Sequence, residues 1–361
     1  MTYHIDMKKN FYLASANTCY GFKNCFDNIC PNGLTYILKG GPGTGKSTFM
    51  KKVGNYFESK GEDVEYFYCS SDIDSLDGIR IVKKNVSIVD GTSPHTTEAK
   101  MPKITETIVN LGDFIGENVK KHKKQVEILL EKKKICFDLA YNYLKCVGNL
   151  FQIEKQLSRK VDFDKELKEL LSLFIPQKRQ QNKLERTLFL SYLSQDGIKS
   201  LKDINNFKHV IAPNLNYVSC TTLLSKLAVY LSKFNIPHIC FYSLFEENRI
   251  ESIFAPQENI LITSEISSNT LKSYNQINHF IKQAGKMLAK AKFYHKKVEN
   301  FYVKNMDFLG LNKCCEKIIS EIEKKSLFFH PMSYAIKNCA QNNNKLQRTA
   351  NQVNNPNLIG N

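Results

Sequence analysis

A run of glycines that ends in a lysine and two hydroxyl residues is the part of this sequence best suited to chemistry. Residues Gly40-Gly41-Pro42-Gly43-Thr44-Gly45-Lys46-Ser47-Thr48 fit the pattern G-x-x-x-x-G-K-[ST], which is typical of a phosphate-binding loop. Glycines let the backbone curl until successive N–H groups point at phosphate oxygens. Lys46 is then placed to reach the β- and γ-phosphates, the Ser47 hydroxyl to bind Mg²⁺, and Thr48 to add an α-phosphate contact.

An aspartate at the end of an apolar run is the second candidate. Asp90 follows Val86-Ser87-Ile88-Val89, the form of a Walker B element, whose carboxylate holds the Mg²⁺ shell. The alternative is a turn residue before Gly91. No glutamate follows Asp90 directly, which argues against fast hydrolysis. Because the sequence has no Asn-Lys-x-Asp motif for reading guanine, ATP is the expected nucleotide.

Further polar residues lie close to these two in sequence. The segment Ser70 to Asp77 holds Asp72, Asp74 and Asp77 and follows a predicted strand. One of these carboxylates could act as general base on a substrate hydroxyl, as in small-molecule kinases. We favour the simpler interpretation that most of them cap turns and helix starts. His95 could orient a water or sense the γ-phosphate, although such a histidine is more often a polar loop residue.

Strands and helices must alternate to bring these residues together. Residues 35–39, 64–69 and 86–90 are predicted strands, and an amphipathic helix follows Thr48. This alternation predicts an α/β fold with a parallel sheet and its ligands at the carboxyl edge of the strands. From about Ile104 to Phe174 the apolar residues recur at helical spacing, which predicts a helical hairpin appended to that sheet.

The pattern of the first half recurs in the second. Residues 36–91 match residues 210–265 at a constant offset, with the apolar positions in phase. We therefore expect an internal duplication of one P-loop NTPase-like unit. The predicted boundaries are 1–185 (core 10–100, helical segment 101–175), 186–333 (core 186–268, helical segment 269–333) and a polar mobile tail, 334–361.

The second copy lacks the phosphate-binding residues. Asn214 to Thr221 lie where the glycine run lies in the first copy, Cys220 replaces the lysine, and Ser264 replaces Asp90. Without glycine this loop cannot bring its amides around a polyphosphate, so we expect scaffolding or regulation from this half. Arg249 or Arg186 could reach the first site as an arginine finger, but a surface arginine is the simpler interpretation.

Composition limits the classes of protein. The 361 residues are 42% hydrophobic, which is typical of a globular chain, and no apolar run is long enough to span a membrane. The first residues lack the apolar core and small-residue cleavage site of a secretion signal, so we do not expect secretion. The 11 cysteines form no CxxC pair, so we expect reduced thiols in a cytoplasm. The net charge of +16 comes mostly from lysines on predicted helices, which could hold nucleic acid or a protein partner or could simply face solvent.

Four segments together resemble a known family. They are FYLASANT-x-x-GF, ILKGGPGTGKSTFMKKVG, VEYFYCSSDIDSLDG and VSIVDGTSPH. They look like the N-terminal half of a bacterial family of tandem P-loop ATPases, found mainly in low-GC Gram-positive organisms. The resemblance covers about the first 150 residues strongly and implies two P-loop domains, each with a helical insertion. This sequence departs from the family at Asn214 to Thr221, where members usually carry a second P-loop motif.

Three functions remain open at this point. The first is an ATPase or ATP-operated switch that uses Mg²⁺ and ATP at the site of Lys46 and Asp90. The second is a small-molecule or nucleotide kinase with an aspartate of the Ser70 to Asp77 segment as base. The third is an ATP-stabilised module that binds nucleic acid or protein on its basic helices.

Overall fold

The fold is of the α/β class, with two mixed β-sheets and six α-helices in the described part of the chain. A computed structural model describes residues 10–30, 33–93, 96–159, 161–174, 185–201, 207–264, 266 and 270–325. Residues 1–319 form one compact unit, and a second unit begins at Ser320. His95 and the expected polar tail, 334–361, lie outside the described residues.

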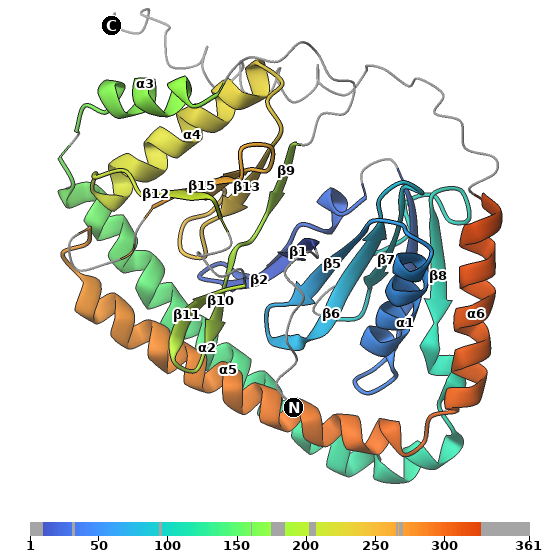
Figure 1. The fold of residues 1–361 in the computed structure, drawn as a ribbon. Helices are drawn as coiled ribbons and strands as arrows, with labels where there is room; N and C mark the ends of the chain where they lie inside the picture. Colours follow the sequence, from blue (N-terminus) through green and yellow to red (C-terminus); the bar gives the residue numbers. More distant parts are fainter. Residues whose placement is uncertain are drawn as a thin grey trace, which may run out of the picture. The chain divides into compact units, whose positions relative to one another are not determined.

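The first sheet positions the glycine run. Its strand order is β1-β5-β6-β7-β4-β8 (Figure 1). The strands are β1 (Asn10–Leu13), β4 (Leu34–Lys39), β5 (Val64–Cys69), β6 (Asp72–Ile81), β7 (Val86–Asp90) and β8 (Glu106–Asn110). β4 lies between β7 and β8 and is parallel to both. Helix α1 (Lys46–Ser59) buries Met50, Val53 and Phe57 at helical spacing and packs on β5 and β6.

The prediction of a purely parallel sheet is wrong, because β6 runs antiparallel to both of its neighbours. Only Ser70 and Ser71 separate β5 from β6. A parallel crossover needs a dozen residues or more, so such a short connection can only form a hairpin. The residues predicted as an acidic loop are therefore the first half of a strand.

The second sheet has the strand order β12-β15-β14-β13-β9. Its strands are β9 (Glu185–Leu188), β12 (His209–Ile211), β13 (His238–Tyr242), β14 (Ile250–Ala255) and β15 (Ile260–Thr263), and α4 (Tyr217–Lys233) follows β12. Strand directions match those of β4-β7-β6-β5-β1. The register matches too: Tyr36 pairs with Ile88 in the first sheet and Val210 with Ile262 in the second.

A short hairpin follows the first strand of each sheet. β2 (Ser15–Thr18) pairs with β3 (Gly21–Asn24), and β10 (Ser191–Ser194) pairs with β11 (Gly197–Ser200). Directly before the hairpins, the Phe189 amide donates to the Leu13 carbonyl oxygen at 2.9 Å. The described residues also contain three short 3₁₀ helices: η1 (Phe26–Asn28), η2 (Leu111–Phe114) and η3 (Glu117–His122).

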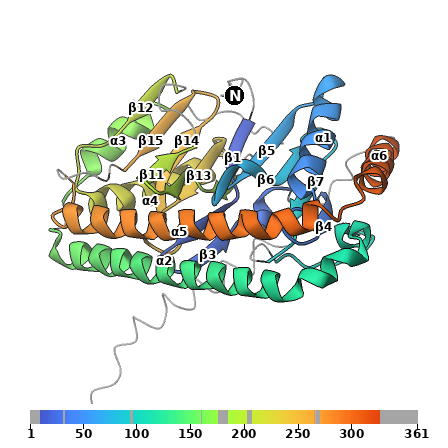
Figure 2. The same cartoon turned by 90° about the horizontal axis from the view of Figure 1, so that it is seen from below.

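Two long helices run side by side, α2 (Lys123–Leu157) and α5 (Tyr274–Val303) (Figures 1 and 2). Ala140 and Leu144 of α2 lie in the same buried cluster as Ile281 and Ala284 of α5. The predicted hairpin within 104–174 is wrong, since α2 pairs with α5 and β8 occupies residues 106–110. Helix α3 (Asp164–Ser172) packs against α4, and Leu170 of α3 lies in the same buried apolar cluster as the side chains of α4.

The last described element is α6 (Phe308–Lys325), so α5 and α6 account for most of the predicted helical segment 269–333. None of the described helices combines the length and the apolar character needed to cross a membrane. The ten cysteines in the described ranges all have free thiols.

Candidate functional site

The glycine loop, residues 40–47, connects the carboxyl end of β4 to the start of α1. Gly43 and Gly45 adopt positive φ angles of 73° and 83°, a conformation that side chains disfavour. The first amide of α1 to reach a carbonyl four residues back is that of Phe49, which donates to Gly45 O at 2.8 Å. The amides of Lys46 to Thr48 therefore have no partner within the helix and can bind an anion.

Hydrogen bonds from the loop's own side chains to its carbonyl oxygens fix the conformation of the loop. The Thr44 hydroxyl donates to Gly41 O at 2.9 Å. The Lys46 ammonium donates to Gly40 O and Gly41 O, both at 2.9 Å, and so lies over the mouth of the loop. Thr92 ties the loop to the end of β7, since its hydroxyl donates to Gly40 O at 2.7 Å. Sequence reasoning did not identify Thr92, because the GT pair after Asp90 reads as an ordinary turn.

Asp90 lies beside Lys46, as the sequence predicted. It ends β7 at the level of Leu38 in β4, so its carboxylate stands at the carboxyl edge of the sheet. Oδ2 of Asp90 lies 3.7 Å from Lys46 Nζ, and Oδ1 accepts a hydrogen bond from the Thr92 amide at 2.8 Å. Only 9% of Asp90 is exposed. This is an almost buried carboxylate next to the one lysine of the glycine loop.

Ser47 and Asp90 fit a magnesium ion as far as their chemistry goes. The Ser47 hydroxyl oxygen accepts from the Leu76 amide at 3.0 Å, which fixes the side chain at the start of α1. A hydroxyl and one carboxylate are hard oxygen ligands, and Mg²⁺ uses few protein ligands together with phosphate and water oxygens. Within the described residues, no group of three or more His, Cys, Asp or Glu side chains could hold a metal ion. A magnesium ion at Ser47 and Asp90 would therefore take its other ligands from phosphate and water oxygens.

The three aspartates of the β5–β6 hairpin have different environments. Asp77 is buried and accepts a hydrogen bond from the Ser15 hydroxyl at 2.6 Å. Asp72 accepts from Lys292 of α5 at 2.7 Å. Burial disfavours the Asp72 carboxylate, but the hydrogen bond and the charge of Lys292 outweigh it and lower its pKa. Asp74 is the exposed member of the three.

Helices α5 and α6 pack against the glycine loop, which sequence spacing gave no means to predict. A Cβ atom on Gly43 would lie 2.8 Å from the carbonyl oxygen of Glu299, and one on Gly45 would lie 2.9 Å from Leu311. The Tyr302 ring lies 3.6 Å from the corresponding position on Gly41. The close contacts with these helices therefore depend on glycine at Gly43 and Gly45, whereas a Cβ atom on Gly41 would lie at an ordinary contact distance.

In the second half, a helix takes the place of the glycine loop. α4 begins at Tyr217, and the side chain of Asn216 caps it by accepting from the Ser219 amide at 2.9 Å. Tyr217 is fully buried, and its ring lies 4.8 Å from that of Phe151 on α2. Burial also raises the pKa of the Cys220 thiol to about 12. A buried aromatic ring thus stands at the sequence position that matches Gly43.

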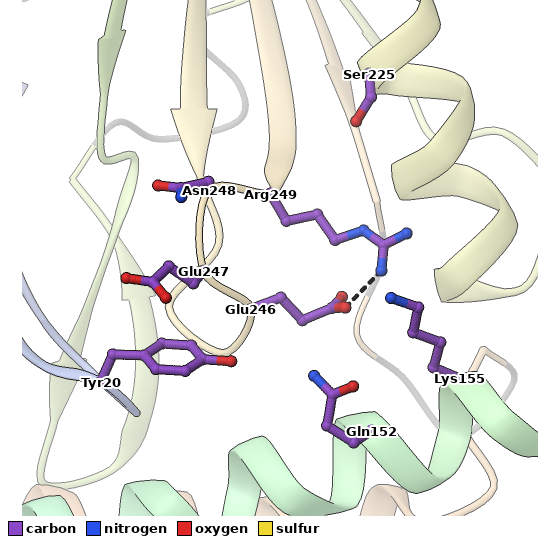
Figure 3. Close-up of a pocket in the computed structure, with 8 residues that line it drawn as sticks. All are labelled: Tyr20, Gln152, Lys155, Ser225, Glu246, Glu247, Asn248 and Arg249. Carbon is purple, nitrogen blue, oxygen red and sulfur yellow. Dashed lines mark hydrogen bonds and ion pairs between the residues drawn. The ribbon is translucent and has the colours of Figure 1, made fainter. Parts of the chain in front are cut away.

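A hollow of about 330 Å³ lies beside α4. It is lined by Tyr20, Gln152, Lys155, Ser225, Glu246, Glu247, Asn248 and Arg249. Figure 3 shows Lys155 reaching toward the ion pair that Arg249 forms with Glu246. Since Arg249 also donates to the Thr222 hydroxyl at 3.2 Å, it is committed to this half.

Arg186 is not an arginine finger, and it is not on the surface either. It lies on β9 with 4% exposure. Its guanidinium forms two hydrogen bonds to the Glu65 carboxylate on β5, at 2.8 and 2.7 Å. Both interpretations made from the sequence are therefore wrong, because this arginine joins the two sheets through a buried, bidentate ion pair.

Comparison with known proteins gives one point of reference for this site. The family model described as Nephrocystin 3, N-terminal, matches residues 22–132. The matched segment contains the glycine loop and Asp90, but it is less than half of the chain, so it shows a similarity of this segment alone. Searches of curated proteins and of solved structures gave no match. The resemblance to a bacterial family of tandem P-loop ATPases stays a prediction.

Proposed function

We propose that this protein binds Mg²⁺ and ATP at the glycine loop and works as an ATPase or an ATP-operated switch. The observation that carries the proposal is the position of Lys46. Its ammonium lies between the loop carbonyls and Asp90, at the start of a helix whose first amides have no partner within the helix. Lys46 and the loop amides would bind the phosphates, and Ser47 and Asp90 would hold Mg²⁺.

The bound ion would neutralise charge on the β- and γ-phosphates, and the protein would position the phosphate chain. Lys46 must leave the carbonyls of Gly40 and Gly41 for this, which is possible because a lysine side chain is long and flexible. Asp90 stays in place through its hydrogen bond from the Thr92 amide. Asp90 therefore keeps its position when the nucleotide binds, whereas the Lys46 side chain changes its partners.

We further propose that the chain is a tandem duplication of one P-loop NTPase-like unit. The support is the shared strand order, strand directions and register of the two sheets, and the equivalent places of α1 and α4. The second copy would be a scaffold without a nucleotide, because Tyr217 and α4 fill the place of the glycine loop. The similarity of residues 22–132 to the Nephrocystin 3 N-terminal model falls on the first copy, which we propose to be competent.

A kinase is the alternative that one observation favours. Asp74 is exposed on β6, two residues before Leu76, whose amide contacts Ser47. Its carboxylate would serve as the base in this alternative. Asp72 and Asp77 are less suited to act as a base, because each already accepts a strong hydrogen bond.

Turnover assays separate these functions. Wild type and Lys46→Ala are incubated with MgATP, alone and with a panel of hydroxylated small molecules and nucleotides, and phosphate and ADP are measured. We expect slow phosphate release without an acceptor, lost in Lys46→Ala. ADP production that depends on an acceptor and is lost in Asp74→Asn would instead identify a kinase. Turnover that is equal in wild type and Lys46→Ala would rule out this site.

A further inference from the structure

The paired helices α2 and α5 bring a second group of cations to the glycine loop. The backbone of Glu299 on α5 packs closely on Gly43, since its carbonyl oxygen would lie 2.8 Å from a Cβ atom added to this glycine. One turn earlier, His295 Nε2 lies 3.5 Å from the Glu299 carboxylate. On its other side, His295 Nδ1 lies 3.3 Å from Lys133 Nζ on α2. These contacts link Lys133, through His295, to the part of α5 that packs against Gly43.

We propose that Lys133 binds the terminal phosphate of the nucleotide, as a second phosphate-binding lysine supplied by the helix pair. The inference rests on the proposed function of the glycine loop. In such loops the backbone cradles the α- and β-phosphates, and the lysine of the loop reaches the β- and γ-phosphates. Lys133 stands on the helix pair and not on the loop, so we expect the loop amides and Lys46 to hold the inner phosphates and Lys133 to hold the terminal one.

The charges around the loop favour an anion at this place. Lys133 is half-buried, and its ammonium group contacts the imidazole of His295 rather than a carboxylate. Burial lowers its pKa, the charge of Lys46 lowers it further, and Glu299 acts in the opposite direction. Lys292 adds a positive charge at Asp72. Asp90 offsets the charge of Lys46 at 3.7 Å. Once Asp90 binds Mg²⁺, a bound phosphate would offset the charges of both lysines.

The acidic groups nearby have other partners. Asp72 is paired with Lys292 and Glu299 with His295. Asp90 would pair with Mg²⁺ once Lys46 turns to the phosphates. Binding of the triphosphate by Lys133 would also connect the nucleotide to α2, whose far end packs on the second half through Phe151.

The test uses the full chain and compares MgATP with MgADP by isothermal titration. Lys133→Gln should lower the affinity for MgATP about tenfold or more, the usual effect of losing a charge-assisted hydrogen bond, and change MgADP affinity by less than about twofold. Lys132→Gln is the matched control, because it removes an exposed lysine from the same helix, and it should bind both nucleotides like wild type.

The outcomes separate this inference from the proposed function. If Lys46→Ala loses MgATP binding while Lys133→Gln binds like wild type, the inference is wrong and the proposed function stands. If Lys46→Ala binds like wild type, the proposed function itself fails. An equal loss of MgATP and MgADP affinity in Lys133→Gln also contradicts the inference, because the contact is then not with the terminal phosphate.

A second measurement needs no variant of Lys133. The wild-type chain is acetylated at its lysines with and without MgATP, and the modification of each lysine is quantified by mass spectrometry. MgATP should protect Lys133 and Lys46 but leave Lys132 unchanged. Protection of Lys46 without protection of Lys133 would overturn the inference.

Discussion

The close contact between Gly43 and α5 predicts a specific effect of adding one methyl group. In Gly43→Ala, the new Cβ atom lies 2.8 Å from the Glu299 carbonyl oxygen and 3.1 Å from Val303 Cγ2. The positive φ angle costs about 1–2 kcal/mol for a residue with a side chain. Overpacking against a helix backbone adds about 1–3 kcal/mol. We therefore expect a loss of about 2–5 kcal/mol in the free energy of unfolding.

Gly61→Ala is the matched control for this prediction. Gly61 has nearly the same φ angle, +77°, but nothing lies within 4 Å of its Cβ position. This variant should lose only the backbone contribution, about 1–2 kcal/mol. Both are measured by urea denaturation, and MgATP affinity by titration. Gly43→Ala should weaken binding about tenfold or more, whereas Gly61→Ala should leave it unchanged. Equal losses of stability in the two variants would refute the packing argument, and unchanged affinity in Gly43→Ala would refute the role of the loop.

Two further predictions concern the rest of the molecule. Glu65→Leu leaves Arg186 buried without its carboxylate and should lower the free energy of unfolding by about 3–5 kcal/mol. The double variant Glu65→Leu/Arg186→Met should recover part of that loss, because Arg80, which also contacts Glu65 at 3.4 Å, still loses its carboxylate. A double variant as unstable as the single one would contradict this account of the pair. Burial raises the pKa of Glu251 from 4.5 to about 7, so the folded protein holds this proton more tightly than the unfolded chain. The resulting stability is fully present below about pH 4.5 and is lost as the pH rises through about 7. Denaturation of wild type and Glu251→Gln across this range should show that loss in wild type alone, and parallel profiles would contradict it.

The arrangement around Lys46 could be predicted from the sequence because its causes are local. A β-prone run, a glycine-rich turn and an amphipathic helix follow one another from Thr35 to Phe57, and their order decides where Lys46 lies. Asp90 was placed correctly for the same reason, since it ends an apolar strand that pairs with β4. The two halves match in apolar pattern at a constant offset, and their strands at the matched positions pair in the same register.

Features that depend on distant parts of the chain could not be predicted. The pairing of α2 with α5 joins segments more than 100 residues apart, and either apolar stripe alone would fit a local hairpin equally well. The cover of Glu299 and Tyr302 over the loop follows from that pairing. β6 was missed because three of its first four residues, Asp72, Asp74 and Ser75, are polar and disfavour a strand, and the pairing with β5 overrides this preference.

Titration of MgATP into wild type, Lys46→Ala and Cys220→Ala tests the central claim most directly. We predict one nucleotide per chain in wild type and Cys220→Ala, with the same affinity. Lys46→Ala should lose about 1.5–3 kcal/mol of binding free energy, which is roughly a 10- to 150-fold weaker affinity. Wild-type affinity in Lys46→Ala, or a loss of binding in Cys220→Ala, would contradict a single phosphate site at the glycine loop.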